Sequence, residues 1–129
     1  NNSDQNQDLV KYIASVLGER VKKVEISNKL VDSPACLAIP EGAMNVRMER
    51  ILMEQKQLNK RSSKILQINP SHPIMIEIAK EINKNNPAKD IIALVEVIFD
   101  QARLVEGEEI ANPCDFANKI NKLLLKVHL

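Results

Sequence analysis

The sequence predicts a single α+β domain, with a small sheet of about three strands packed with about five helices. Short alternating or apolar runs between turn-forming residues indicate the strands, and longer stretches with apolar residues three and four apart indicate the helices. The chain has 129 residues, of which 44% are hydrophobic and 2% aromatic. That length suits one domain, whose core Leu, Ile, Val and Met must fill.

The chain begins with a polar stretch that leads into a helical pattern. Residues 1–7 are expected to be the remnant of a linker from a longer parent chain, which leaves 8–129 as the folded domain. Apolar residues within 9–17 recur at helical spacing, with Asp8 as a cap and Gly18 as the stop. A first helix is therefore predicted from the cap to the glycine.

Two strands are predicted to follow this helix. Val24 and Ile26 alternate with polar residues within 21–27, which indicates a strand with one face toward solvent. Turn formers then precede a short apolar run at 35–39. Because only a turn separates the two segments, they are expected to pair directly with each other.

The middle of the chain predicts a helix, a loop, a strand and a second helix. Residues 43–55 carry an apolar helical stripe, whereas 55–64 is polar, lacks periodicity and is expected to be a mobile loop. A third strand is predicted at Lys64–Ile68. The helix Pro73–Ile82 should follow, since Pro is favoured in the first helical turn.

The last third predicts two helices with more apolar surface than one small core needs. Residues 87–105 are apolar around most of the helical circumference, and Asn112 and Pro113 then cap and start a final helix with an apolar stripe. Oligomerisation would cover this surface. The alternative is that both helices are buried in one monomeric core. Lys119, Lys122 and Lys126 are expected on the solvated face of the final helix.

Composition argues against several classes of function. With 18 basic and 17 acidic residues the net charge is +1, so no large field attracts nucleic acid or a membrane surface. The basic run Lys56, Lys60, Arg61 and Lys64 has no interleaved aromatic residues and is expected to be solvated. Cys36 and Cys114 are too few for a disulfide scaffold, which favours a cytoplasmic protein.

Few residues offer chemistry. His72 lies between two prolines and is expected to form a local hydrogen bond rather than act as a base. Cys36, Cys114, His72 and His128 lack the close spacing of zinc ligands, so no metal site is predicted. No glycine-rich phosphate loop or Walker lysine occurs, and no catalytic or cofactor-binding residue is predicted.

Four motifs together resemble the ninety-kilodalton heat-shock chaperone family. They are DSPACL at 32–37, MERI at 48–51, INPSHPI at 68–74 and ANKI at 117–120. The resemblance implies the C-terminal dimerisation domain of a bacterial member, whose last two helices form a four-helix bundle with those of a second chain. It also implies that the parent chain binds ATP and magnesium in domains outside this chain, so this chain is not itself an enzyme. Because no acidic tail follows the last helix, helical-repeat cochaperones are not expected.

The resemblance also implies two sets of contact residues, one for a homodimer and one for unfolded client proteins. The family's matching Met-rich helix projects between the protomers, and the pattern puts Met44, Met48, Ile51 and Leu52 on one side of it. The expected dimer interface comprises Leu94, Ile98, Ala102, Val105, Phe116, Ile120, Leu123, Leu124 and Val127.

A second class of function stays open. The chain could be a stand-alone interaction domain for a fixed protein or nucleic-acid partner. A chaperone module predicts a salt-insensitive dimer, whereas a nucleic-acid binder predicts a monomer whose binding weakens steeply with salt.

Overall fold

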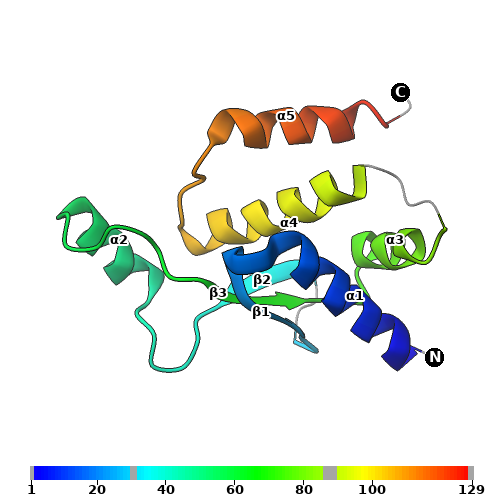
Figure 1. The fold of residues 1–129 in the computed structure, drawn as a ribbon, viewed down its shortest axis with the longest axis horizontal. Helices are drawn as coiled ribbons and strands as arrows, with labels where there is room; N and C mark the ends of the chain where they lie inside the picture. Colours follow the sequence, from blue (N-terminus) through cyan, green and yellow to red (C-terminus); the bar gives the residue numbers. More distant parts are fainter. Residues whose placement is uncertain (1, 30–31, 86–89, 128–129) are drawn as a thin grey trace.

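The computed structural model describes residues 2–29, 32–85 and 90–127. Five α-helices, one short 3₁₀ helix and three strands make up this part of the chain, which confirms the predicted α+β class. Figure 1 shows the helices α1 and α4 against the sheet, α2 projecting from the body, and α5 lying beyond α4. The elements are α1 (Asn2–Leu17), η1 (Gly18–Arg20), β1 (Val21–Ile26), β2 (Ala35–Ala38), α2 (Val46–Glu54), β3 (Lys64–Ile68), α3 (Pro73–Ile82), α4 (Asp90–Glu106) and α5 (Pro113–Leu124).

The strands are ordered β1-β3-β2, so the expected direct pairing of the first two strands is wrong. β3 lies between them, parallel to β1 and antiparallel to β2. Alternation indicates which face of a strand is buried but not which strand lies beside it. β3 is the most buried of the three, with Leu66 and Ile68 almost fully enclosed. The Lys-rich β1 forms an edge, where charged side chains reach solvent.

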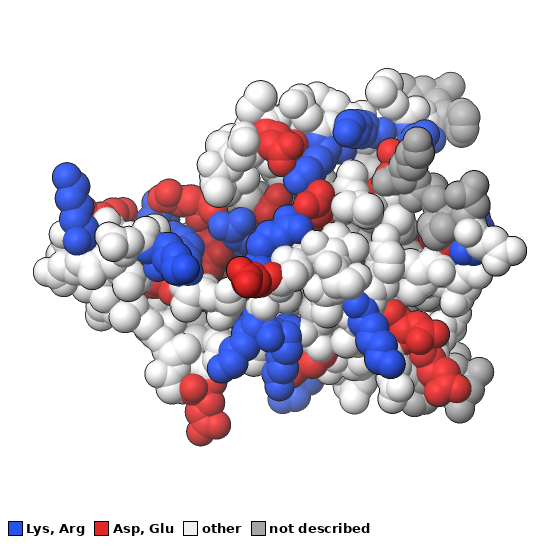
Figure 2. Space-filling model, in the orientation of Figure 1, with Lys and Arg blue, Asp and Glu red and all other residues white. Residues whose placement is uncertain are grey.

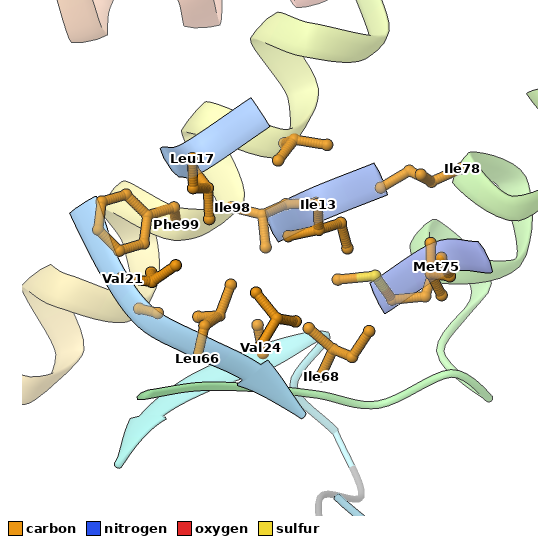
Figure 3. Close-up of a cluster of buried hydrophobic side chains, with 14 of the residues drawn as sticks. Ile13, Leu17, Val21, Val24, Leu66, Ile68, Met75, Ile78, Ile98 and Phe99 are labelled. Atoms are coloured by element: carbon orange, nitrogen blue, oxygen red, sulfur yellow. The ribbon is translucent and has the colours of Figure 1, made fainter. Parts of the chain in front are cut away.

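One core fills the space between the sheet and the helices. Figure 3 shows side chains of α1, α3 and α4 converging on the inner face of the sheet, with Leu66 below Ile98 and Met75 beside Ile68. Phe99 is the aromatic member of this core. The aliphatic core expected from the composition is therefore observed.

Local sequence chemistry sets several element boundaries. His72 caps α3, since its Nδ1 accepts a hydrogen bond from the backbone N–H of Ile74 at 3.1 Å, and Pro73 follows in the first turn. Asn112 caps α5 in the same manner by accepting from Asp115 N–H at 3.0 Å. Both starts are as predicted, and His72 has the local role expected for it.

Helix α1 differs from its prediction at one end only. It begins at Asn2 rather than at an Asp8 cap, so most of the expected linker residues are helical. Gly18, at a φ of +56°, ends the helix as predicted. Arg20 then donates to the carbonyl oxygens of Leu17 and Val16, which places a cation at the negative end of the helix. Whether 1–7 connects to a preceding domain stays a prediction.

Candidate interaction surfaces

The outer side of α2 carries an apolar strip, the methionine strip, formed by Met44, Met48, Ile51 and Leu52. Met48 is 47% exposed, Met44 and Ile51 are also exposed, and Leu52 is half-buried. Asn45 caps the helix by accepting from Met48 N–H at 2.8 Å, so the first methionine lies just before the cap. The strip thus lies outside the protomer's core.

The inner side of α2 is attached to the body by a buried carboxylate. Within Val46–Glu54 the buried side chains are Val46 and Glu49. Glu49 Oε1 accepts from Lys64 Nζ at 2.7 Å and from Arg61 Nη1 at 3.2 Å. Its Oε2 accepts from the backbone N–H and the hydroxyl of Ser62, at 3.0 and 2.8 Å. Both carboxylate oxygens are therefore saturated.

Lys64 continues these contacts toward the end of α4. Its ammonium also pairs with Glu108 Oε2, and Glu108 Oε1 accepts from Arg103 Nε at 3.0 Å. Arg103 lies over the Phe99 ring, 5.5 Å from its centroid. We call Glu49, Arg61, Lys64, Arg103 and Glu108 the ion cluster. It joins α2, β3 and the residues that follow α4.

The prediction that all four residues of the basic run are solvated is wrong for the two that belong to the ion cluster. The Lys64 side chain is only 2% exposed and that of Arg61 is 12% exposed, whereas Lys56 and Lys60 are exposed as expected. Lys64 alternates with Ile65 in β3, and this puts it on the same face as Leu66 and Ile68. The charge of Lys64 suggested that its side chain would reach solvent. Its place in the alternation of β3 puts the side chain on the buried face instead.

The surroundings of Glu49 favour the charged form of its carboxylate. Its burial disfavours the charge, yet the hydrogen bonds from Lys64 and Ser62 outweigh burial and hold the pKa of Glu49 below its ordinary value. Among the described residues, no buried side-chain nitrogen or oxygen lacks a hydrogen-bond partner. A buried network with every member paired is a rigid attachment.

Helix α5 is attached to α4 by a half-buried stripe with an ion pair beside it. Phe116, Ile120 and Leu123 are half-buried, and none of the described residues Pro113–Leu124 is fully buried. Lys119 pairs with Glu96 of α4 at 3.2 Å and with Asp115 at 2.8 Å. The hydrogen bond to Asp115 raises the pKa of Lys119.

Lys119 is therefore not on the solvated face where it was expected. It is half-buried on the side of α5 that faces α4, where its ammonium group pairs with Glu96. Lys122 and Lys126 are exposed as predicted. The pKa of Glu96 is lowered, since hydrogen bonds from Arg20 and Lys119 outweigh its burial. The α4–α5 contact thus has an apolar stripe with a charged margin.

The residues expected at a dimer interface divide into inner and outer sets. Ile98 and Ala102 are buried in the protomer's own core, on the side of α4 that faces the sheet, and their assignment to an interface stays a prediction. The periodicity of an almost wholly apolar helix does not tell which face meets its own sheet. Leu94 also packs against the core, although it is only partly buried. The remaining residues of that set stay a prediction.

The outer set is exposed on α4 and α5. Val105 is 83% exposed and Leu124 is 60% exposed, and Val127 is also exposed. Sequence reasoning missed Ile92, Leu104 and Leu125, which are exposed as well. For Ile92 and Leu104 the signal was present in the sequence, since a helix that is apolar all around must expose the side opposite its core. We call these two helices, with their connection, the C-terminal hairpin.

The rest of the described surface offers little chemistry. Figure 2 shows Lys and Arg side chains interspersed with Asp and Glu on the face it displays. Cys36 is half-buried and Cys114 exposed, and both are free thiols. Among residues 2–29, 32–85 and 90–127, no group of three His, Cys, Asp or Glu could hold a metal ion, and no helix is long and apolar enough to cross a membrane. His128 lies outside the described residues.

Comparison with known proteins identifies the family. The family model described as "Hsp90 protein" matches residues 1–128. This chain belongs to the Hsp90 family. The family consists of heat-shock chaperones that act in stress response and protein folding, which confirms the resemblance carried by the four sequence motifs.

Several relatives carry the name "Chaperone protein HtpG". That of Orientia tsutsugamushi (strain Boryong) is 48% identical over 124 residues, covering 95% of this chain and 20% of the relative. Those of Wolbachia pipientis wMel and Rickettsia bellii (strain OSU 85-389) are each 44% identical and cover 98% of this chain and 20% of the relative. The chain thus spans about a fifth of the length of the curated relatives it matches.

Proposed function

We propose that this chain is the C-terminal dimerisation and client-contact module of an HtpG-type chaperone. The chain pairs with a second copy through the C-terminal hairpin, and two hairpins form a four-helix bundle. The methionine strip contacts unfolded or partly folded client proteins. The parent chain is cytoplasmic and hydrolyses ATP, with ATP and magnesium bound in domains other than this one.

The observation that carries the dimer proposal is the poor burial of α5. A helix packed on a single neighbour, with no fully buried residue among 113–124, leaves much of its apolar surface in water. Exposed Leu124, Leu125 and Val127 lie near its end. A second copy of the same chain can cover such a surface, because a two-fold interface uses the same patch on both chains and needs no other partner protein.

The client proposal rests on the exposure of the methionine strip. Unbranched Met repacks against unlike apolar surfaces at little cost, which suits a site that meets many partners. The four residues of the strip are not members of the core cluster, and they are a different set from the exposed apolar residues of the hairpin. Client binding and dimerisation therefore use different surfaces of one protomer.

Mass in solution tests the dimer proposal. The chain should scatter light as two copies at roughly ten micromolar, and raising the salt concentration should not dissociate it, because an apolar interface tolerates salt. A monomer at that concentration would overturn the interface assignment. A monomer that binds nucleic acid in a salt-sensitive manner would favour a stand-alone interaction domain instead.

A further inference from the structure

The attachment of α2 is unusual for a projecting helix, because its deepest contact is ionic. The exposed methionine strip and the buried Glu49 lie on different sides of the same helix. Glu49 receives directed hydrogen bonds from Lys64, Arg61 and Ser62. Apolar contacts allow a helix to slide or roll, whereas saturated carboxylate contacts fix one orientation.

The partner of Glu49 is also held from the opposite side. Lys64 lies between Glu49 and Glu108, and the Glu108 carboxylate is in turn paired with Arg103 of α4. Gly107, at a φ of +94°, makes the turn that ends α4 immediately before Glu108. The position of Glu108 is therefore set where the connection from α4 to α5 begins.

A second link between the same two regions is exposed and weak. Arg50 of α2 lies 3.6 Å from Glu109, with side chains 50% and 69% exposed. Such surface pairs contribute little to a fixed geometry. The buried path through Lys64 is therefore the one that relates α2 to the C-terminal hairpin.

We propose that Glu49 is the positioning residue of the methionine strip and that Lys64 and Glu108 make α2 take its orientation from the end of α4. The C-terminal hairpin then sets the direction in which each protomer presents its strip. The consequence for clients rests on the proposed function, whereas the orientation itself is a property of the fold.

Spin-label distances in the full-length parent chaperone test the orientation. Labels are placed at Arg47→Cys on α2 and Gln101→Cys on α4, both exposed positions, with the native cysteines replaced by Ser. Labelled protein is mixed with an excess of unlabelled protein, so that pairs within one protomer dominate. The parent with an intact ion cluster should give one narrow distance distribution.

The decisive variant is Glu49→Met/Lys64→Met/Glu108→Met. It replaces the three charges by side chains of similar length, so no charge is left at the three positions; Arg61 loses its carboxylate partner but lies near the surface, and Arg103 keeps Asp100. The distribution should broaden about twofold, because apolar contacts do not fix the roll of α2. The control Arg50→Gln/Glu109→Gln removes the exposed link and should keep the narrow distribution. A narrow distribution in the folded triple variant would overturn the proposal.

A milder variant covers the case in which the triple variant fails to fold. Glu49→Gln keeps the hydrogen bonds that Ser62 can donate but loses the charge that holds Lys64 and Arg61. It should also broaden the distribution, and an unchanged distribution in this variant would overturn the proposal equally.

Aggregation of an unfolded client separates this proposal from the proposed function. In the unlabelled parent, the triple variant should suppress aggregation about threefold less well, with dimer mass unchanged. If Met48→Ser/Leu52→Ser leaves suppression intact, the client function fails, while the distance result still decides the orientation. If Met48→Ser/Leu52→Ser reduces suppression but the triple variant does not, the strip binds clients and the positioning role fails.

Discussion

Helices α2 and α5 both lie outside the sheet and its core helices, yet they are attached by opposite means. α2 turns its apolar strip outward and is anchored by a buried carboxylate, Glu49. α5 turns a half-buried apolar stripe toward α4 and has its ion pairs at the margin, where Lys119 meets Glu96. The buried side of α2 combines the Glu49 carboxylate with Val46, whereas the inner contact of α5 is mainly apolar.

The difference indicates how exposed apolar residues should be interpreted in each helix. A buried ionic anchor contributes little net stability over an apolar one, but it fixes geometry. Under the proposed function, α2 presents its strip to clients in a fixed direction. α5 has a shallow apolar contact that a second copy would extend, so its exposed residues suit a permanent interface.

The largest effect is expected from breaking the anchor of α2. Lys64→Met leaves the buried carboxylates of Glu49 and Glu108 without their shared cation, although Arg61 and Arg103 still reach them. We expect a loss of about 3 kcal/mol in the free energy of unfolding and a fall of about 10 °C in Tm. Urea and thermal unfolding of the chain measure both. Lys60→Met, at an exposed position in the loop that precedes β3, should change stability by less than about 0.5 kcal/mol. Equal stability of the two variants would show that the ion cluster does not contribute to the free energy of unfolding.

Local sequence chemistry predicted where helices start and end better than it predicted which elements lie side by side. Pro73, Asn112 and Gly18 act on their own backbone within one turn, and each was placed correctly. The order of the strands depends on contacts across the sheet. A pattern within one strand does not contain that information, so β1 was paired with β2 instead of β3.

The candidate sites show the same division. Helical spacing placed Met48 and Ile51 on one side of α2, but their exposure was expected only when the resemblance to the family was added. The burial of Glu49 was not predicted, although Val46 and Met53 flank it at three and four residues and so mark a second inward side of α2. Glu108, which shares Lys64 with Glu49, is remote in sequence, and only the fold brings the two carboxylates to one ammonium group.

The C-terminal hairpin should lose its partner when charge is placed on it. Leu124→Glu would bury one unpaired carboxylate from each of the two chains, at a combined cost of roughly 3 kcal/mol or more, which is at least about a 100-fold rise in the dimer Kd. Leu124 is 60% exposed in the protomer, so helical content should persist. Light-scattering mass should fall from two copies to one. Lys122→Glu, on the exposed side of the same helix, should keep the dimer, and its dissociation would move the interface to that side.

Acid should weaken the anchor of α2 in a definite direction. The pKa of Glu49 lies below its ordinary value of 4.5, so its contribution to stability is complete above that pH and is lost as pH falls through the lowered pKa. From about pH 5 to about pH 3 the wild-type free energy of unfolding should therefore fall more steeply than that of Glu49→Gln. Chemical denaturation at each pH measures the two slopes. Parallel slopes would mean that Glu49 does not contribute to acid sensitivity.

The smallest effect on stability is expected at the methionine strip. Met48 is 47% exposed and Leu52 is half-buried, so Met48→Ser/Leu52→Ser removes little buried hydrocarbon. We expect a loss below about 1 kcal/mol, against about 2 to 5 kcal/mol for each such side chain in a core. Dimer mass should not change, because neither Met48 nor Leu52 belongs to the hairpin. Suppression of client aggregation by the full-length parent should nevertheless fall, since the apolar surface that meets clients has been removed. A variant that unfolds would place the strip in the core, and a stable variant with full suppression would leave α2 as a surface helix without a client role.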